Sequence, residues 1–146
     1  MTPQQRAETA AQAMMQADNA SRDLGMQITA IGPGLATLTM RVTGKMLNGH
    51  KTCHGGYIFT LADSAFAFAC NSYNRVTVAQ QNQITYIAPG KADELLTATA
   101  RETAMAGRSG VYDVMVTGED GRIVATMRGL SRTIRGQQFP EEGQDA

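Results

Sequence analysis

Hydrophobic and polar residues alternate most clearly between Leu35 and Thr43. Every second side chain is apolar, and the positions between them hold threonines and one arginine. Alternation with a period of two is typical of a strand with one buried and one solvated face. We therefore predict a half-buried strand over 35–43, preceded by a turn at 32–34, where two glycines flank a proline.

A different pattern begins at Gly55 and continues to about Tyr73. Apolar residues fall on almost every face of a helix drawn through this segment, which predicts a helix buried nearly all round. Asp63 is the only formally charged side chain between Lys51 and Arg75. A carboxylate in such surroundings is costly to bury unless it is paired or used in chemistry. The residues alone leave open whether Asp63 is a structural group or a functional one.

The remaining segments predict one more helix and five more strands. Thr2 is a suitable N-cap for a helix over 3–22, and Gly25 ends it. Strands are expected between turn signals over 26–31, 76–88, 94–104, 110–117 and 122–134. Short turns between consecutive strands indicate an antiparallel meander, so we expect an α+β fold with a long antiparallel sheet around one buried helix. We expect a single domain over 1–135 and a disordered tail over 136–146.

The composition narrows the class of protein. A chain of 146 residues with 42% hydrophobic and 18% charged residues is typical of one globular domain. A net charge of zero and few aromatic residues argue against a nucleic-acid binder. The longest apolar stretch, about 57–70, is interrupted by polar residues and too short for a membrane span, and the N-terminus lacks the apolar core of a secretory signal. We expect a cytoplasmic protein without membrane contact.

Basic residues are unevenly distributed. The last eleven residues hold three acids and no base, so the remainder carries a net charge of +3. Six of the ten arginines follow residue 100. Because the planar guanidinium suits phosphate, a phosphorylated small ligand is one interpretation, and ordinary surface charge is the other.

Two glycines at the start of the apolar helix suggest a site for a developing oxyanion. Free amides and the positive end of the helix dipole meet there, and Gly55 and Gly56 allow a ligand carbonyl to approach closely. Gly55 and Asp63 are eight residues apart, which is about 12 Å along a helix. One thioester or ester carbonyl cannot lie within hydrogen-bond distance of both. If the two cooperate, one of them must come from a second subunit.

Several motifs around this helix resemble the hotdog-fold thioesterases of phenylacetate catabolism, the PaaI family. The resemblance extends from about residue 20 to 134 and rests on an Asn and a His before two glycines, with an acid seven residues after the second glycine. Its motifs are Met46–His50, Cys53–Gly56, Leu61–Asp63, Ala69–Ser72, the turn at 89–90, and Gly110–Asp113.

The resemblance implies hydrolysis of acyl-CoA thioesters, with phenylacetyl-CoA and its ring-hydroxylated forms as substrates. Asp63 would be the nucleophile or general base, the Gly55 amide would polarise the thioester carbonyl, Asn48 and His54 would orient thioester or water, and Ser64 would position a water. Family members are dimers that assemble into tetramers, and no metal or bound cofactor is expected. Substrate-binding candidates are Gly56 and, for the CoA phosphates, Arg108, Arg128 and Arg132, with Lys91 as a further base.

Other interpretations use the same loop. His50, Cys53 and His54 are spaced so that they suit zinc, although further clustered ligands are missing nearby. Cys53 with His54 is a weak nucleophile–base pair because sequence neighbours rarely aim their side chains together. A hotdog hydratase or dehydratase would also use a His and an acid near this helix. A non-catalytic acyl-CoA sensor would need a DNA-binding module, and only 25 residues precede the first expected strand.

Overall fold

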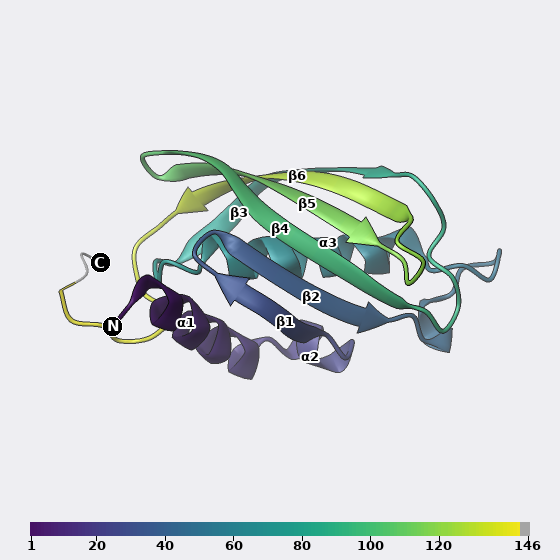
Figure 1. Ribbon diagram of the computed structural model, residues 1–146, viewed down its shortest axis with the longest axis horizontal. Helices are drawn as coiled ribbons and strands as arrows, with labels where there is room; N and C mark the ends of the chain where they lie inside the picture. The colour runs from purple at the N-terminus through teal and green to yellow at the C-terminus, as the bar shows by residue number, and fades with distance from the viewer. Residues whose placement is uncertain (144–146) are drawn as a thin grey trace.

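The computed structural model describes residues 1–143, and in that range six strands form one antiparallel sheet. Their spatial order is β1-β2-β4-β5-β6-β3. The sheet curves around helix α3 (Gly55–Cys70), which lies along its inner face (Figure 1). The expected sheet around one central helix is thus confirmed. The strands are β1 (Gln27–Gly32), β2 (Leu35–Arg41), β3 (Thr77–Tyr86), β4 (Leu95–Ala106), β5 (Ser109–Thr117) and β6 (Ile123–Thr133).

The core lies between α3 and the inner face of the sheet. In β2 and just after it, the alternating apolar residues are fully buried, as the pattern predicted. On α3, the aromatic rings of Phe66 and Phe68 are buried among aliphatic side chains from the strands. The Phe66 ring meets Tyr112 of β5 edge to face, with ring centroids 5.4 Å apart. This packing fixes α3 relative to the central strands.

Helix α3 ends earlier than the sequence pattern predicted. Its last residue is Cys70, and Asn71 follows as the C-cap. The Asn71 side chain donates to the backbone oxygen of Thr77 and accepts from its backbone nitrogen, both at 2.9 Å. These two hydrogen bonds turn the chain from the helix into β3, so Tyr73 lies in the connection.

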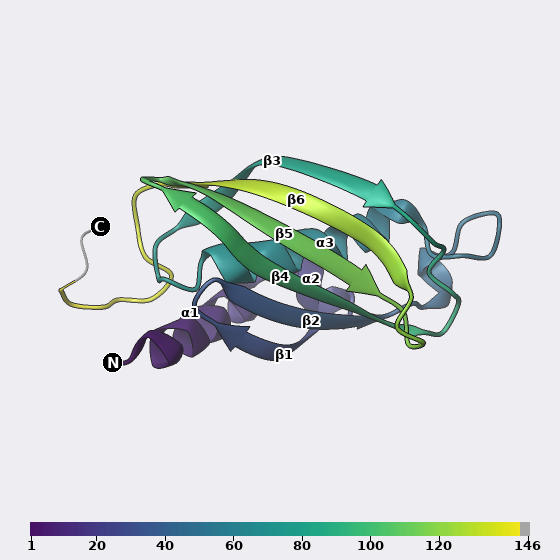
Figure 2. The same ribbon diagram turned by 45° about the horizontal axis from the view of Figure 1, so that its top comes forward.

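The N-terminal segment forms two helices instead of the single one expected over 3–22. Helix α1 (Pro3–Ala17) begins with a capping box at Thr2, and α2 (Asn19–Asp23) follows after a break at Asp18. The Asp18 carboxylate accepts hydrogen bonds from the Ser21 amide at 2.9 Å and from its hydroxyl at 2.7 Å, so it caps the second helix. Both helices lie on the β1 side of the molecule (Figures 1 and 2).

Part of the segment expected to be a disordered tail, residues 136–141, forms hydrogen bonds with the body of the chain. The Asn74 side chain accepts hydrogen bonds from the backbone of Gln138 and Phe139. Arg6 of α1 forms a bidentate pair with Glu141, in which Nε donates to Oε1 and Nη2 donates to Oε2, both at 2.9 Å. Residues 144–146 lie outside the described residues.

A short 3-10 helix, Gly44–Met46, precedes the loop that leads into α3.

The two sides of the sheet differ in what covers them. On the β1 side, α1 contacts β1 and α2 contacts α3. Strand β3 is the opposite edge, and only Thr77 among its ten residues is buried. Within residues 1–143, β3 pairs with β6 alone. In Figure 2, no helix of the described chain lies beyond β3 on the side away from β1. No helix in the described range is long and apolar enough to cross a membrane.

Candidate active site

Asp63 lies in the middle of α3, where the helix faces the inner side of β3. Its Oδ1 accepts a hydrogen bond from Nδ2 of Asn82 at 2.7 Å. Burial raises the pKa of Asp63, the hydrogen bond from Asn82 opposes that rise, and the charge of Asp18 adds to it. The carboxyl is half-buried, so it is both perturbed and reachable. These are the properties expected of a carboxylate that exchanges a proton or attacks a substrate.

Ser64 is turned toward the other side of α3. Its hydroxyl lies 2.8 Å from the hydroxyl of Ser21, which in turn donates to Asp18. Both serines are buried. The structure therefore links Ser64 to α2 and does not bring it together with the other predicted site residues. Its expected role in positioning a water has no support in these contacts.

The start of α3 offers free backbone donors. His54 is the N-cap, and its Nδ1 accepts from the Gly56 amide at 2.9 Å, so a neutral His54 carries its proton on Nε2. Gly55 is the first helical residue, and its amide has no acceptor within the helix. The predicted grouping of Gly55, Gly56 and His54 at this terminus is therefore present, and the Gly55 amide suits a developing oxyanion.

Tyr86 of β3 covers this terminus and was missing from the predicted site. Its hydroxyl donates to the Gly55 carbonyl oxygen at 2.9 Å, and its ring is half exposed. A Cβ at position 55 would lie 3.0–3.2 Å from the tyrosine ring. Glycine at position 55 thus lets the tyrosine pack against the helix start.

Contacts with β3 confirm that Gly55 and Asp63 are far apart within one chain. Tyr86 touches the first of them and Asn82 the second. Four residues along a strand span about 13 Å, which matches the estimate of about 12 Å for eight residues of helix. Within one chain, the Gly55 amide and the Asp63 carboxylate are therefore too far apart to contact the same carbonyl group.

Asn48 organises the loop before α3. Its side-chain oxygen accepts from the His50 amide at 2.9 Å and from the Thr52 amide at 3.2 Å. The loop closes on itself, because the His54 amide donates to the Met46 carbonyl at 2.7 Å. Asn48 therefore lies in the same small hairpin as the helix start. Its side-chain nitrogen, Nδ2, has no hydrogen-bond partner among the described residues and can donate to a ligand.

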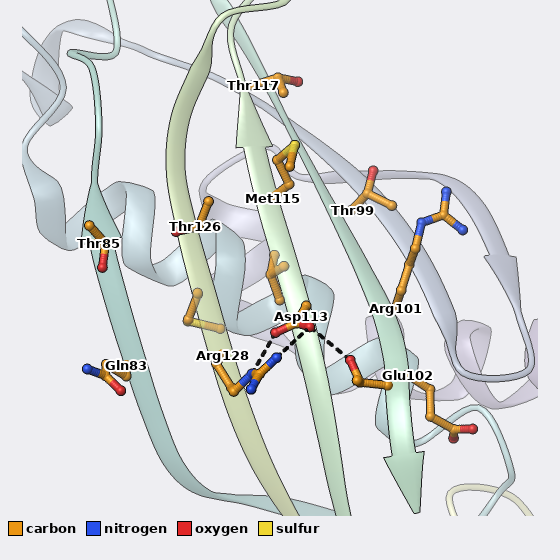
Figure 3. A pocket seen from close by; sticks show the side chains of 13 residues that line it. Gln83, Thr85, Thr99, Arg101, Glu102, Asp113, Met115, Thr117, Thr126 and Arg128 are labelled. Atoms are coloured by element: carbon orange, nitrogen blue, oxygen red, sulfur yellow. Dashed lines mark hydrogen bonds and ion pairs between the residues drawn. The ribbon is translucent and has the colours of Figure 1, made fainter.

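The three candidate arginines differ in their surroundings. Arg128 lies on the outer face of the sheet, where its guanidinium forms a bidentate pair with Asp113 at 2.8 and 2.9 Å (Figure 3). This pair borders a groove of about 870 Å³ to which none of the predicted catalytic residues contributes. Arg108 lies in the β4–β5 turn, and Arg132 reaches Ser109 at 3.5 Å at the same end of the sheet. Arg108 and Arg132 therefore lie together at the β4–β5 hairpin, away from Arg128.

The loop cysteine is poorly suited to nucleophilic chemistry. Cys53 is buried, and burial raises the pKa of its thiol to about 11. Its thiolate is therefore scarce near neutral pH. Residues 1–143 contain no group of three or more His, Cys, Asp or Glu side chains arranged to hold a metal ion. Neither alternative built on His50, Cys53 and His54 gains support from this geometry.

Comparison with known proteins defines the class. The family model of the Thioesterase superfamily matches residues 50–125, which include the start of α3 and Asp63. The chain belongs to this superfamily, and its fold is the hotdog fold of a thioester hydrolase.

Matches to individual proteins indicate which thioesterases within the superfamily the chain is similar to. Over 126 residues, the chain is 44% identical to the acyl-coenzyme A thioesterase PaaI of Escherichia coli, covering 86% of this chain and 90% of the relative. The solved structure of the E. coli PaaI protein, from a phenylacetic acid degradation operon, superposes with a TM-score of 0.91 at 41% identity, covering 93% of this chain and 99% of that one. A hypothetical thioesterase from Streptococcus pneumoniae, solved with coenzyme A, gives a TM-score of 0.74 at 28% identity over 77% of this chain and 90% of that one.

Proposed function

We propose that the protein hydrolyses phenylacetyl-CoA or ring-hydroxylated phenylacetyl-CoA to the free acid and CoA, at a site that two copies of the chain share. The observation that carries this proposal is the position of Asp63 and Gly55 on one helix beneath the uncovered edge of β3. The names of the E. coli relatives support the acyl-CoA and phenylacetate part of the proposal.

The shared site requires two-fold pairing along β3. An exposed edge strand presents unpaired backbone groups to a second strand, and β3 of a second copy offers the same groups in the opposite direction. The α3 helices of the two copies would then run antiparallel beneath the joined sheet. This arrangement brings Gly55 of one copy toward Asp63 of the other, twice per dimer.

Hydrolysis follows from the two half-sites. The Gly55 amide binds the thioester oxygen and stabilises the negative charge that develops when the carbonyl carbon is attacked. If Asp63 is the general base, it takes a proton from water as the new C–O bond forms. When the C–S bond breaks, the CoA thiolate leaves and takes up that proton. If Asp63 attacks directly, the C–S bond breaks as an anhydride forms, and water then hydrolyses the anhydride.

CoA would be recognised at the end of the sheet where Arg108 and Arg132 lie, at the β4–β5 hairpin. Among the described residues, neither Arg108 nor Arg132 forms an ion pair, whereas Asp113 neutralises Arg128. We therefore favour Arg108 and Arg132 for the CoA phosphates over Arg128. The remaining parts of the proposal are a cytoplasmic location, assembly of dimers into a homotetramer, and catalysis without a metal or bound cofactor. They rest on the family resemblance and on the expectations from sequence.

The direct test is thiol release by purified protein from a panel of acyl-CoA esters. The panel should include phenylacetyl-CoA, a ring-hydroxylated form, a short aliphatic ester and a long one. We expect the highest kcat/KM for the aryl esters and no effect of EDTA. Loss of activity with chelator and its return with zinc would contradict the site assignment. Higher kcat/KM for the aliphatic esters would contradict the substrate assignment alone.

A further inference from the structure

We propose that Asn82 is the positioning residue of Asp63: its amide holds one carboxylate oxygen in place and leaves the other free to act on substrate. This inference rests on the proposed function and deepens it. Among residues 1–143, Asn82 is the one side chain that hydrogen-bonds Asp63, and it does so from a different element of the fold. The second oxygen of Asp63 has no protein partner in that range and is left to meet water or thioester.

Neighbouring residues leave little space around the Asn82 side chain. In the sheet register it lies opposite Gly129 of β6. A Cβ at position 129 would lie 2.9 Å from Oδ1 of Asn82 and 2.8 Å from the ring of Phe66. The absence of a side chain at position 129 therefore makes room for both groups, and they in turn restrict how far the Asn82 amide can move.

The orientation of this amide favours an ionised Asp63. Its nitrogen faces the carboxylate, while its oxygen is buried without a hydrogen-bond partner among the described residues. Exchanging the two ends would place a carbonyl oxygen against a carboxylate oxygen, and two acceptors repel each other. Leaving a buried oxygen unpaired is unfavourable, so the contact with Asp63 dominates the choice of orientation.

The other groups around Asp63 act in the opposite direction. Asp18, at the junction of α1 and α2, places a like charge nearby, and burial also raises the pKa of Asp63. Cys70 on the same helix remains a neutral thiol, because burial raises its pKa to about 12, so it adds no charge next to Asp63. Asn82 is the one group that lowers the pKa of Asp63 in this environment. Removing it should therefore disturb both the position and the ionisation of the carboxylate.

The test compares Asn82→Ala and Asn82→Leu with wild type and with a control, Gln83→Ala. Gln83 is the next residue of β3 and lies on the outer face (Figure 3). We expect both Asn82 variants to lower kcat by about 10- to 100-fold with KM changed less than about threefold, because a misplaced base affects the chemical step. The acidic limb of the kcat/KM profile should move to higher pH. The Gln83 variant should match wild type in both measurements.

A second measurement separates this inference from the proposed function. Carbon-13 NMR of aspartate-labelled protein, with Asp63→Asn to assign the signal, reports the titration of the Asp63 carboxyl without substrate. A higher titration midpoint in folded Asn82→Ala supports the contact even if no acyl-CoA ester is hydrolysed, and in that case only the proposed function fails. An unchanged midpoint together with unchanged kcat would overturn the role of Asn82 and leave the thioesterase proposal intact.

Discussion

The β1 and β3 sides of this molecule differ in whether other parts of the chain cover the edge strand. Both are edge strands of one sheet. On the β1 side, the chain supplies its own cover: α1 packs three buried alanines inward, and Gln4 donates to the Ile31 carbonyl of β1 at 2.7 Å. On the β3 side, nine of ten residues are at least partly exposed, and no other described element lies beyond the strand. Asp63 and Gly55 contact this second edge, through Asn82 and Tyr86 respectively.

The two sides should therefore differ in how mutations affect the protein. Ser64 faces α2 through its hydrogen bond to Ser21, whereas its neighbour Asp63 faces β3 through Asn82. Consecutive residues of one helix thus contact opposite sides of the molecule, and in the proposed function only Asp63 takes part in the chemistry. Changes on the β1 side should act on folding, and changes on the β3 side should act on association and catalysis.

The largest effect is expected from the carboxylate on the β3 side. Asp63→Ala and Asp63→Asn should each lower kcat for thioester hydrolysis by about 10³-fold or more, because both proposed roles need the charge. Substrate binding should persist, as measured with a slowly hydrolysed ester. If Asp63→Asn keeps most of the wild-type kcat, the acid is structural.

A smaller effect should follow when the β3 edge is disrupted without touching the site. Gln81→Lys places like charges near the middle of two paired β3 strands and should weaken dimerisation at least about tenfold. Specific activity should then fall on dilution and return at high protein concentration. The matched control is Ala30→Lys on the β1 edge, an exposed position that should leave both properties unchanged.

Analytical ultracentrifugation and assays over a range of protein concentrations measure both quantities. Equal effects of the two lysines, or none from either, would remove the distinction between the edges.

A still smaller effect, on kcat/KM, is expected from the contact at the start of α3. Tyr86→Phe removes the hydroxyl that donates to the Gly55 carbonyl, and a hydrogen bond of this kind contributes about 0.5–1.5 kcal/mol. We therefore expect kcat/KM to fall by roughly 2- to 13-fold if the tyrosine holds the oxyanion donor in place. Steady-state kinetics decide this point, and an unchanged kcat/KM would limit the tyrosine to packing.

The smallest effect concerns stability. The folded-state pKa of Asp63 is raised, so the folded protein holds this proton more tightly than the unfolded chain does. Above both pKa values the ionised group therefore disfavours folding, and the penalty disappears as pH falls through the raised pKa. Asp63→Asn should raise Tm at neutral pH, with a gain that shrinks on acidification. Thermal unfolding at several pH values checks this, with Asp23→Asn as the exposed control; a lower Tm at neutral pH would contradict it.

Sequence patterns predicted the elements whose burial is local and repetitive. The alternation in 35–43 and the continuous apolar face of α3 identify β2 and the central helix directly. The break at Asp18 was missed because helix-favouring residues precede it and Ala20 and Arg22 follow it, while the cap depends on how the aspartate side chain turns back to Ser21. The hydrogen bonds of residues 136–141 could not be predicted because their partners, Arg6 and Asn74, are distant in sequence.

The site was only half predictable for a related reason. Gly55, Gly56, His54 and Asp63 share one segment, so their spacing carries information. Asn82 and Tyr86 contribute through the register of β3 against α3, which no local pattern encodes. A period-two assignment from Ile84 would have placed both on the inner face, and this is the one signal that was available.

The central claim, a site built from two copies, is tested most directly by mixed dimers of Gly55→Val and Asp63→Ala chains, purified through two different tags. Each variant alone should be inactive. The mixed dimer should recover about half of the wild-type activity, because one of its two sites then combines an intact Gly55 with an intact Asp63.

The matched control pairs wild type with the chain that carries both substitutions. In that dimer each shared site contains one damaged residue, so we predict no activity. The reverse result, an inactive mixed dimer and a half-active control, would show that each chain holds a complete site and would contradict the account.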